Sequence, residues 1–190
     1  MRKIYSFMHI SLDGFVAGPH GEMDWIKVDP EIFEHVEKRI SQGDTALYGR
    51  ITYEMMEGYW PTAADQPNAS RHDIEHARWY KQARKVVLSS TMKTTQQGNM
   101  LVINSNLPDA IRKLKEVGDR DILLFGSPRA THSLMEIDAI DGYWLFVNPI
   151  VLGKGMPLFA NGHGKSRLKL MSSQPFSNGV IALDYIVDRG

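Results

Sequence analysis

Short apolar runs alternate with amphipathic segments along most of the chain. The runs have the length of strands and are rich in β-branched and aromatic residues, which is typical of buried strands. The segments between them place apolar residues at helical spacing, as Ile32, Val36 and Ile40 do, and so predict helices that face a core. The predicted strands are residues 3–10, 45–48, 85–89, 100–103, 121–125 and 143–147, and the predicted helices are residues 30–42, 52–57, 72–82, 107–117 and 129–137. Residues 58–70 contain two prolines and are predicted to form a loop.

The end of the chain contains strands alone. Residues 168–172 and 180–187 are predicted strands, and a turn with Pro175 and Asn178-Gly179 separates them. Alternation of strands and helices implies right-handed crossovers and a mostly parallel sheet covered on both faces. The tail adds antiparallel strands to its edge. The pattern therefore predicts a single α/β domain over residues 1–190, and such a sheet binds ligands outside the carboxyl ends of its parallel strands.

Composition excludes several classes of function. Lys+Arg and Asp+Glu number 22 each, so the chain has no net charge that would attract nucleic acid or an anionic membrane. It has no cysteine, which excludes disulfides, thiol nucleophiles and zinc–thiolate sites. Polar residues interrupt the N-terminal apolar run, and no other run approaches the ~20 residues of a membrane-spanning helix. We expect a soluble, cytoplasmic protein that acts on a small molecule.

The strand predicted at 45–48 runs into a helix through Gly49, Arg50 and Thr52. A glycine at the strand end lets the backbone approach a ligand, and the helix start offers unpaired N–H groups with partial positive charge. Arg50 adds a planar set of donors that suits a phosphate. The alternative is that Thr52 caps the helix and Arg50 is solvated, and on its own the fragment favours this alternative.

Two further strand ends have the same character. Leu88 is followed by the hydroxyl residues Ser89-Ser90-Thr91, which can bind a ribose phosphate or simply form a turn. The strand at 121–125 ends at Gly126-Ser127, and a proline then opens the next helix. This is not a G-x-G-x-x-G motif, so a standard dinucleotide-binding fold is not indicated. Three such junctions on one sheet predict a long ligand with more than one phosphate.

The segment His72-Asp73-Ile74-Glu75-His76 matches the H-x-x-E-H pattern of inverted zinc proteases. Both histidines lie on one face of the predicted helix, as two metal ligands would. No obvious acidic ligand follows downstream, and a match of this length in a polar helix arises easily by chance. We therefore interpret the segment as a solvated helix and expect no metal.

Four segments, in order, resemble the dihydrofolate-reductase-like superfamily. They resemble most closely the branch with the reductase domain of the bifunctional riboflavin-biosynthesis deaminase/reductase and its stand-alone relatives. The segments are SLDGFVA at 11–17 followed by Asp24-Trp25, GRITYE at 49–54, VLSST at 87–91, and residues 141–159, which include NPIVLGKG and PLF. The resemblance covers nearly the whole chain. It implies a three-layer dihydrofolate-reductase-like fold with an eight-stranded, mostly parallel sheet, bound NADPH and a homodimer.

Positions that match these motifs give candidate site residues. On this resemblance, the candidate cofactor-binding residues are Ala17, Gly18, Gly49, Arg50, Thr52, Leu88, Ser89, Ser90, Gly126, Ser127, Arg129 and Ala130. The loop at 17–18 would cover the nicotinamide, residues 89–90 would lie by the adenosine 2′-phosphate, and residues 126–130 would follow the pyrophosphate. The candidate catalytic residues are Asp13, Asp24 and Trp25. His9 is a further candidate on the first strand, with a core role as the alternative.

Two features depart from the family. Gly126-Ser127 stands where relatives commonly have Gly-Gly, so the serine either crowds the pyrophosphate or adds a donor to it. Dihydrofolate reductases also keep a carboxylate early in the first helix. Here Ile32 and Phe33 are predicted to hold the inward face, with Glu31 and Glu34 to the side, so neither glutamate is a convincing proton donor.

These observations leave three functions open. The first is an NADPH-dependent reductase of a small heteroaromatic or sugar-linked substrate, resembling 5-amino-6-(5-phosphoribosylamino)uracil reductase. The second is a dihydrofolate or pterin reductase. The third is a non-catalytic nucleotide-binding protein of the same fold, which would bind NADPH without turnover.

Overall fold

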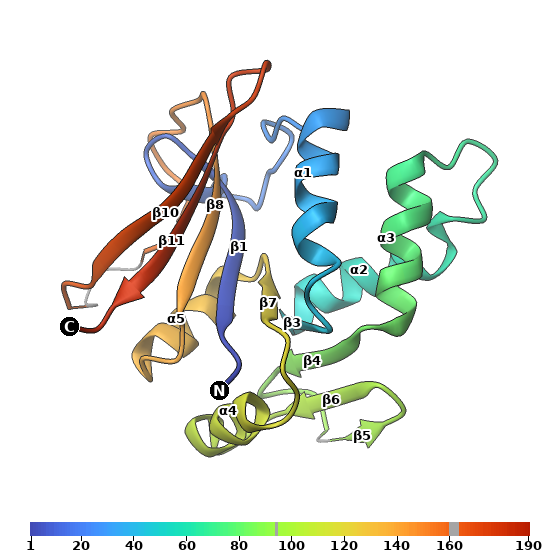
Figure 1. Cartoon of the computed structure of the whole chain (residues 1–190), viewed down its shortest axis with the longest axis vertical. Helices are drawn as coiled ribbons and strands as arrows, with labels where there is room; N and C mark the ends of the chain where they lie inside the picture. The colour runs from blue at the N-terminus through green and yellow to red at the C-terminus, as the bar shows by residue number, and fades with distance from the viewer. Residues whose placement is uncertain (94, 160–163) are drawn as a thin grey trace.

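The structure is a computed structural model that describes residues 1–93, 95–159 and 164–190. Its strands are β1 (Ile4–Ser11), β2 (Phe15–Ala17), β3 (Thr45–Gly49), β4 (Arg84–Leu88), β5 (Gln96–Gln97), β6 (Met100–Ile103), β7 (Ile122–Phe125), β8 (Gly142–Asn148), β9 (Met156–Pro157), β10 (Arg167–Pro175) and β11 (Ile181–Asp188). Its helices are α1 (Pro30–Ile40), α2 (Arg50–Ala63), α3 (Arg71–Gln82), α4 (Leu107–Glu116) and α5 (Pro128–Glu136). The sheet lies between α1, α2 and α3 on one face and α4 and α5 on the other (Figure 1).

The two faces of the sheet carry separate cores because successive side chains of a strand point to opposite sides. On β7, Ile122 and Leu124 pack toward α4 and α5, whereas Leu123 and Phe125 pack toward α1 and α3. All four of these side chains are at most 5% exposed. Burial on both faces explains why the sequence of this strand is a continuous apolar run.

The main sheet has the order β10-β11-β8-β1-β7-β3-β4-β6-β5. β1 pairs in parallel with β7 and β8, and the parallel pairing continues from β7 through β3 and β4 to β6. β11 runs antiparallel to β8 and β10. The predicted mostly parallel sheet with antiparallel C-terminal strands is therefore confirmed. Within the described residues the sheet has nine strands instead of eight, counting the two-residue β5.

The outer edge of this sheet is strand β10, which is exposed along its whole length. Leu168, Leu170 and Met171 are 37%, 49% and 54% exposed. Exposed apolar edge strands favour pairing with another chain. The homodimer implied by the resemblance stays a prediction, which sedimentation velocity of the purified protein would test.

Helix α2 differs from the sequence prediction. A brief helix at 52–57 and a loop at 58–70 were expected, but α2 continues to Ala63 with Pro61 inside its last turn. Trp60 explains the extension, because its ring packs on His76 of α3 with 3.9 Å between ring centroids, and its Nε1 donates to Met56 Sδ at 3.1 Å. Packing of this kind outweighs the helix-breaking tendency of Gly58 and Pro61. Spanning a bilayer would require a longer, more apolar helix than any in the described parts of the chain.

Candidate active site

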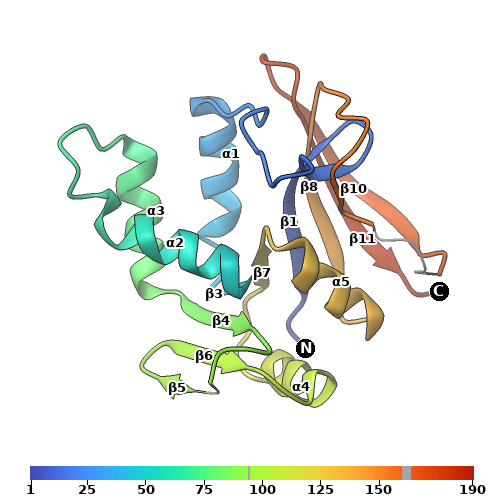
Figure 2. The same cartoon turned by 180° about the vertical axis from the view of Figure 1, so that it is seen from behind.

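The three predicted phosphate junctions lie side by side at one edge of the sheet. β3 lies between β7 and β4, and all three strands run in the same direction. Register places Gly49 beside Leu88, so the second junction begins directly next to the first. The start of α2 and the β7–α5 connection are neighbours in Figure 2. The strand order therefore agrees with the sequence-based expectation that these turns lie at one edge of the sheet.

Ser127 joins the first and third junctions. Its hydroxyl oxygen accepts a hydrogen bond from the Gly49 N–H at 2.7 Å and lies 2.9 Å from the Thr52 hydroxyl. A Cβ on Gly49 would lie 2.4 Å from this oxygen and 3.6 Å from the Cβ of Ala130, so only glycine fits here without a shift. Gly126 and Ser127 both have positive φ, of 54° and 59°. A serine in the left-handed region is strained, which marks this turn as unusual.

Two helix starts at this edge lack a side-chain cap. The N-cap residues are Gly49 for α2 and Ser127 for α5, and neither makes a side-chain capping hydrogen bond. The alternative interpretation of Thr52 as a helix cap is wrong, because its hydroxyl bonds to Ser127 instead. N–H groups at such helix starts attract anions through their partial positive charge. The edge therefore offers two adjacent positions for phosphate groups.

Arg50 and Arg129 lie at the first turns of α2 and α5. The Arg50 guanidinium pairs with Glu54, and its Nη1 lies 2.9 and 3.0 Å from the two carboxylate oxygens. This i,i+4 pair is on the surface, with the two side chains 42% and 53% exposed. Exposed pairs contribute little free energy, so Arg50 can exchange Glu54 for a phosphate at small cost. Arg129 is exposed.

At the second junction, the Ser89 hydroxyl closes the turn that follows β4. The Ser89 Oγ accepts hydrogen bonds from the backbone N–H groups of Thr91 and Met92, at 3.2 and 3.1 Å. Ser90 is exposed beside it. Both interpretations from the sequence remain compatible with this geometry, because the turn presents Ser90 to solvent at the same edge that carries Gly49.

The Asp13 carboxylate links the loop after β1 to the loop after β8 by hydrogen bonds. Its carboxylate accepts hydrogen bonds from the Ser11 hydroxyl at 2.6 Å and from the N–H groups of Leu152 and Gly153 at 3.1 and 2.8 Å. The hydrogen bond from Ser11, followed by those from the two amides, lowers the pKa of Asp13. A carboxyl that holds its negative charge this way is a poor proton donor at neutral pH. The structure gives Asp13 a positioning role, and its catalytic role stays a prediction.

The loop expected to cover the nicotinamide packs against the loop after β8. Ala17 of β2 pairs with Met156 of β9, and the two loops form a small antiparallel sheet (Figures 1 and 2). A Cβ on Gly155 would lie 2.2 Å from the Ala17 carbonyl oxygen, so the backbones are in direct contact. Gly18 follows immediately and donates its N–H to the Glu22 carbonyl. The candidate loop at 17–18 is thus held by residues more than 130 positions away.

Asp24 and Trp25 lie in the same loop, farther from the sheet. Asp24 is exposed. Trp25 is half-buried, and its Nε1 donates to the Glu22 carbonyl at 3.1 Å. This bond fixes the indole within its own loop and leaves the catalytic assignment of both residues a prediction.

Asn148, at the carboxyl end of β8, is a positioning residue that the sequence did not single out beyond its motif. Its side chain is fully buried, accepts the Lys27 N–H at 2.8 Å and donates to the Phe146 carbonyl at 3.1 Å. It therefore anchors the long connection between β2 and α1 to the sheet. The sequence signal for this role was the motif NPIVLGKG, which places an asparagine at the end of a buried strand. A buried side-chain amide there needs hydrogen-bond partners nearby.

His9 lies next to Asn148 in the aromatic core. Its ring stacks on Phe146 with 4.9 Å between ring centroids. The distance between His9 Nδ1 and Asn148 Nδ2 is 3.4 Å. Burial lowers the pKa of His9 to about 4. The side chain is therefore neutral at pH 7, and these contacts favour the core role over a charged catalytic one.

This burial predicts that His9 makes stability depend on pH. The unfolded histidine titrates near 6.5 and the folded one near 4, so between these values the unfolded state binds more protons and stability falls as pH falls. We expect the free energy of unfolding to drop by roughly 2–3 kcal/mol from this group between pH 7 and pH 4.5. Urea titrations at both pH values should show a smaller drop for His9→Phe, which keeps a ring. An equal drop in both proteins would contradict this account.

The start of α1 holds no inward carboxylate, as the sequence indicated. Ile32 is 1% exposed and faces the sheet. Glu31 accepts hydrogen bonds from Ser177, and Glu34 pairs with Lys38 at the surface. The prediction that Ile32 and Phe33 both face inward is right for Ile32 and wrong for Phe33, whose ring stacks on His72 of α3 with 4.0 Å between ring centroids. Neither glutamate takes the place of a dihydrofolate-reductase acid.

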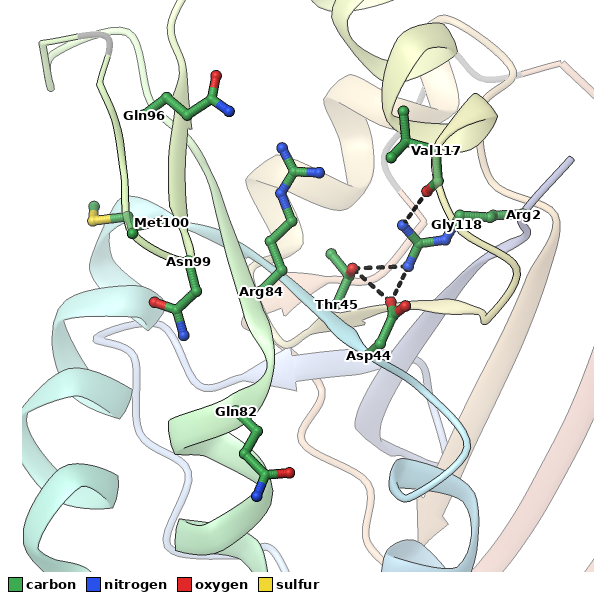
Figure 3. A pocket seen from close by; sticks show the side chains of 11 residues that line it. Arg2, Asp44, Thr45, Gln82, Arg84, Gln96, Asn99, Met100, Val117 and Gly118 are labelled. Carbon is green, nitrogen blue, oxygen red and sulfur yellow. Dashed lines mark hydrogen bonds and ion pairs between the residues drawn. The ribbon is translucent and has the colours of Figure 1, made fainter.

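A pocket of about 400 Å³ lies at the opposite edge, by the amino ends of the strands (Figure 3). Arg2 occupies its wall, forms an ion pair with Asp44 and donates to the carbonyls of Val117 and Arg120 and to the Thr45 hydroxyl. These partners engage four of the five N–H donors of the guanidinium. Ligands of open α/β sheets bind at the carboxyl ends, so we do not expect a cofactor in this pocket.

The fold and the clustered junctions define a dihydrofolate-reductase-like α/β protein. The family model of the RibD C-terminal domain matches residues 2–182, and the chain belongs to this family. This family is that of the RibD reductase domain, which supports a reductase-type function in the riboflavin pathway.

Three similar proteins each match the chain over nearly its whole length. The uncharacterized protein YyaP of Bacillus subtilis (strain 168) is 31% identical over 186 residues, which cover 97% of this chain and 94% of YyaP. A Shewanella sp. PV-4 protein assigned to riboflavin biosynthesis has a TM-score of 0.71 at 23% identity, covering 98% of this chain and 99% of its own. Dihydrofolate reductase from Enterococcus faecalis, in complex with NADP(H), has a TM-score of 0.64 at 15% identity, covering 98% and 96%. The two structures show the shared fold.

Proposed function

We propose that this protein is an NADPH-dependent reductase of a small heteroaromatic or sugar-linked substrate. The observation that carries the proposal is the junction of Gly49 and Ser127, where two uncapped helix starts converge on adjacent parallel strands. Membership in the RibD C-terminal domain family supports the reductase class. The NADP(H) complex of a structural neighbour with the same fold supports the choice of cofactor.

The residues present fit a dinucleotide. Gly49 and Gly126 leave the backbone bare at the two junctions, and a Cβ on Gly126 would only reach ordinary contact with Thr52, at 3.4 Å. The start of α5 and the turn at 126–127 would hold the pyrophosphate, and Ser89-Ser90 and Arg50 would lie beside the 2′-phosphate. Bound NADPH supplies a hydride, while the protein supplies orientation and exclusion of water. The loops tied by Asp13 and Ala17 would cover the reacting end.

The proposed substrate class rests on the resemblance to the RibD reductase domain, and a panel assay tests it. NADPH oxidation, followed at 340 nm, is measured with 5-amino-6-(5-phosphoribosylamino)uracil, dihydrofolate and simple carbonyl compounds. We expect turnover with the phosphoribosylamino compound or a close analogue and weak turnover with dihydrofolate, because α1 presents no inward carboxylate. Turnover with dihydrofolate alone would show that the substrate assignment is wrong.

The lack of that carboxylate favours a second candidate, a nucleotide-binding protein without catalytic activity. The same assay separates the two functions when it is combined with a binding measurement. Saturable NADPH binding without oxidation on any substrate of the panel would support the second candidate and reject the reductase.

Arg50 provides a test of cofactor discrimination. We expect Arg50→Ala to weaken NADPH binding by ~1.5–3 kcal/mol, about 10- to 100-fold, because a charge-assisted bond to the 2′-phosphate is lost. NADH, which lacks that phosphate, should bind almost unchanged. Glu54→Gln is the matched variant, since it releases Arg50 from its pair, and should leave NADPH binding equal or tighter. Equal losses for NADPH and NADH in Arg50→Ala would exclude contact between Arg50 and the 2′-phosphate.

A further inference from the structure

A cluster of three potential metal ligands lies between α1 and α3, away from the strand-end junctions. Glu37 comes from α1, and His72 and His76 come from successive turns of α3. Glu37 Oε2 lies 3.9 Å from His72 Nδ1 and 3.8 Å from His76 Nδ1. The three ligand atoms all lie within 4.8 Å of one another. An acidic ligand was expected downstream of the histidines, whereas Glu37 lies upstream of them on another helix.

These atoms are buried and lack ordinary partners. The side chains of His76, His72 and Glu37 are 7%, 14% and 19% exposed. Within the described part of the chain, Glu37 Oε2 and the Nδ1 atoms of both histidines form no hydrogen bond. Distances of 3.8 and 3.9 Å are too long for a hydrogen bond. Three converging polar atoms without partners are unfavourable unless something binds between them.

Aromatic packing holds the two imidazoles in place. Phe33 of α1 stacks on His72 with 4.0 Å between ring centroids and an interplanar angle of 7°. Trp60 of α2 packs on His76 at 3.9 Å. A capping box between Ser70 and Asp73 fixes the first turn of α3, which carries His72. Ligands held by their surroundings in this way bind a metal without a large loss of side-chain entropy.

We propose that Glu37, His72 and His76 bind one divalent transition-metal ion, with Zn²⁺ the best fit. Two imidazoles and one carboxylate form a known zinc ligand set, with bonds of ~2.0–2.2 Å and thus ~3.3–3.5 Å between tetrahedral ligands. Closing the present separations of 3.8 and 3.9 Å to that spacing needs shifts of under an ångström. Three protein ligands leave one position for water.

The other acidic residues of the His72–His76 motif bind elsewhere, so a metal ion at this site would have a structural role and not a catalytic one. Glu75 pairs with Arg71 at 2.7 Å, outside the cluster. Asp73 caps α3 and accepts a hydrogen bond from Tyr59 at 2.9 Å. Neither is placed as the general base of a zinc protease. The ion therefore links α1 to α3 and stabilises the layer that covers this face of the sheet.

Isothermal titration of Zn²⁺ into untagged, EDTA-stripped full-length protein tests the site. We expect one equivalent per chain and a rise in melting temperature on binding, since an ion that binds only the folded state stabilises it. Glu37→Gln and His76→Gln should each weaken Zn²⁺ binding by at least ~100-fold, because loss of a ligand exceeds the ~10- to 100-fold effect of losing a supporting residue. Glu75→Gln, on the same helix, should bind Zn²⁺ as the unchanged protein does.

Circular dichroism of each variant without metal separates loss of the site from loss of the fold. Should His76→Gln fail to fold, Glu37→Gln decides the question, because it keeps the size and shape of the Glu37 side chain. The proposal is overturned if the unchanged protein takes up no stoichiometric Zn²⁺. It is also overturned if folded Glu37→Gln retains the affinity, or if Glu75→Gln loses as much as Glu37→Gln.

Discussion

Replacing Ser127 by leucine is expected to weaken NADPH binding by at least ~100-fold, because the larger side chain fills the space that the backbone must leave for a phosphate. The serine hydroxyl lies 2.7 Å from the Gly49 nitrogen and 2.9 Å from the Thr52 hydroxyl, so a leucine would bury both groups without partners. A branched side chain at a φ of 59° adds strain. Titration calorimetry with NADPH measures the loss, and a melting curve reports the fold.

Two variants at the same position separate crowding from disruption. Ser127→Ala keeps the Cβ and the positive φ but frees the Gly49 N–H, and should bind NADPH as well as the unchanged protein. Ser127→Gly restores the family-like Gly-Gly pair and should bind equally or more tightly. If Ser127→Leu remains folded and binds NADPH normally, the β7–α5 turn is not a cofactor site.

Replacing Arg2 by methionine is expected to lower the free energy of unfolding by ~2–4 kcal/mol, because it removes a buried guanidinium from its ion pair with the partly exposed Asp44 and leaves its other partners unsatisfied. Arg2 is 5% exposed, and its guanidinium links the start of β1 to Asp44 and Thr45 at the start of β3. It also donates to the carbonyls of Val117 and Arg120 (Figure 3). Equilibrium unfolding in urea measures the change.

Arg84→Met is the matched control, since Arg84 lines the same pocket. Among the described residues, the Arg84 side chain forms no ion pair. We expect Arg84→Met to change the free energy of unfolding by less than ~1 kcal/mol. NADPH binding should survive both changes, because this pocket lies at the other end of the strands. Equal effects of the two variants on stability would contradict the structural role assigned to Arg2.

The strands and most helices could be predicted because local pattern determines them. Buried runs such as residues 121–125 and helical spacing such as that of Ile32, Val36 and Ile40 survive in the structure with shifts of one or two residues. Helix α2 was too short in the prediction because its last turns depend on the packing of Trp60 against α3. The pairing of β2 with β9 joins segments about 140 residues apart, and no local pattern encodes it.

The sequence predicted which strand-to-helix segments form the candidate site, but not which residues of these segments contact one another. Glycines and hydroxyls at strand ends indicated where a phosphate could bind, and the topology brings them together. The bridge from Ser127 to Gly49 spans 78 positions and the clamp from Asp13 to Gly153 spans 140. The Arg50–Glu54 pair was readable from i,i+4 spacing. Glu37 could not be linked to His72 and His76, because the packing of α1 on α3 alone brings them together.

We propose that the carboxyl edge of β7, β3 and β4 forms an NADPH site. Titration calorimetry of the unchanged protein with NADPH and with NADH measures whether it does. We expect one saturable NADPH site per chain, with NADH bound at least ~10-fold more weakly because it lacks the 2′-phosphate. If neither nucleotide shows saturable binding, this edge of the sheet is not a dinucleotide site.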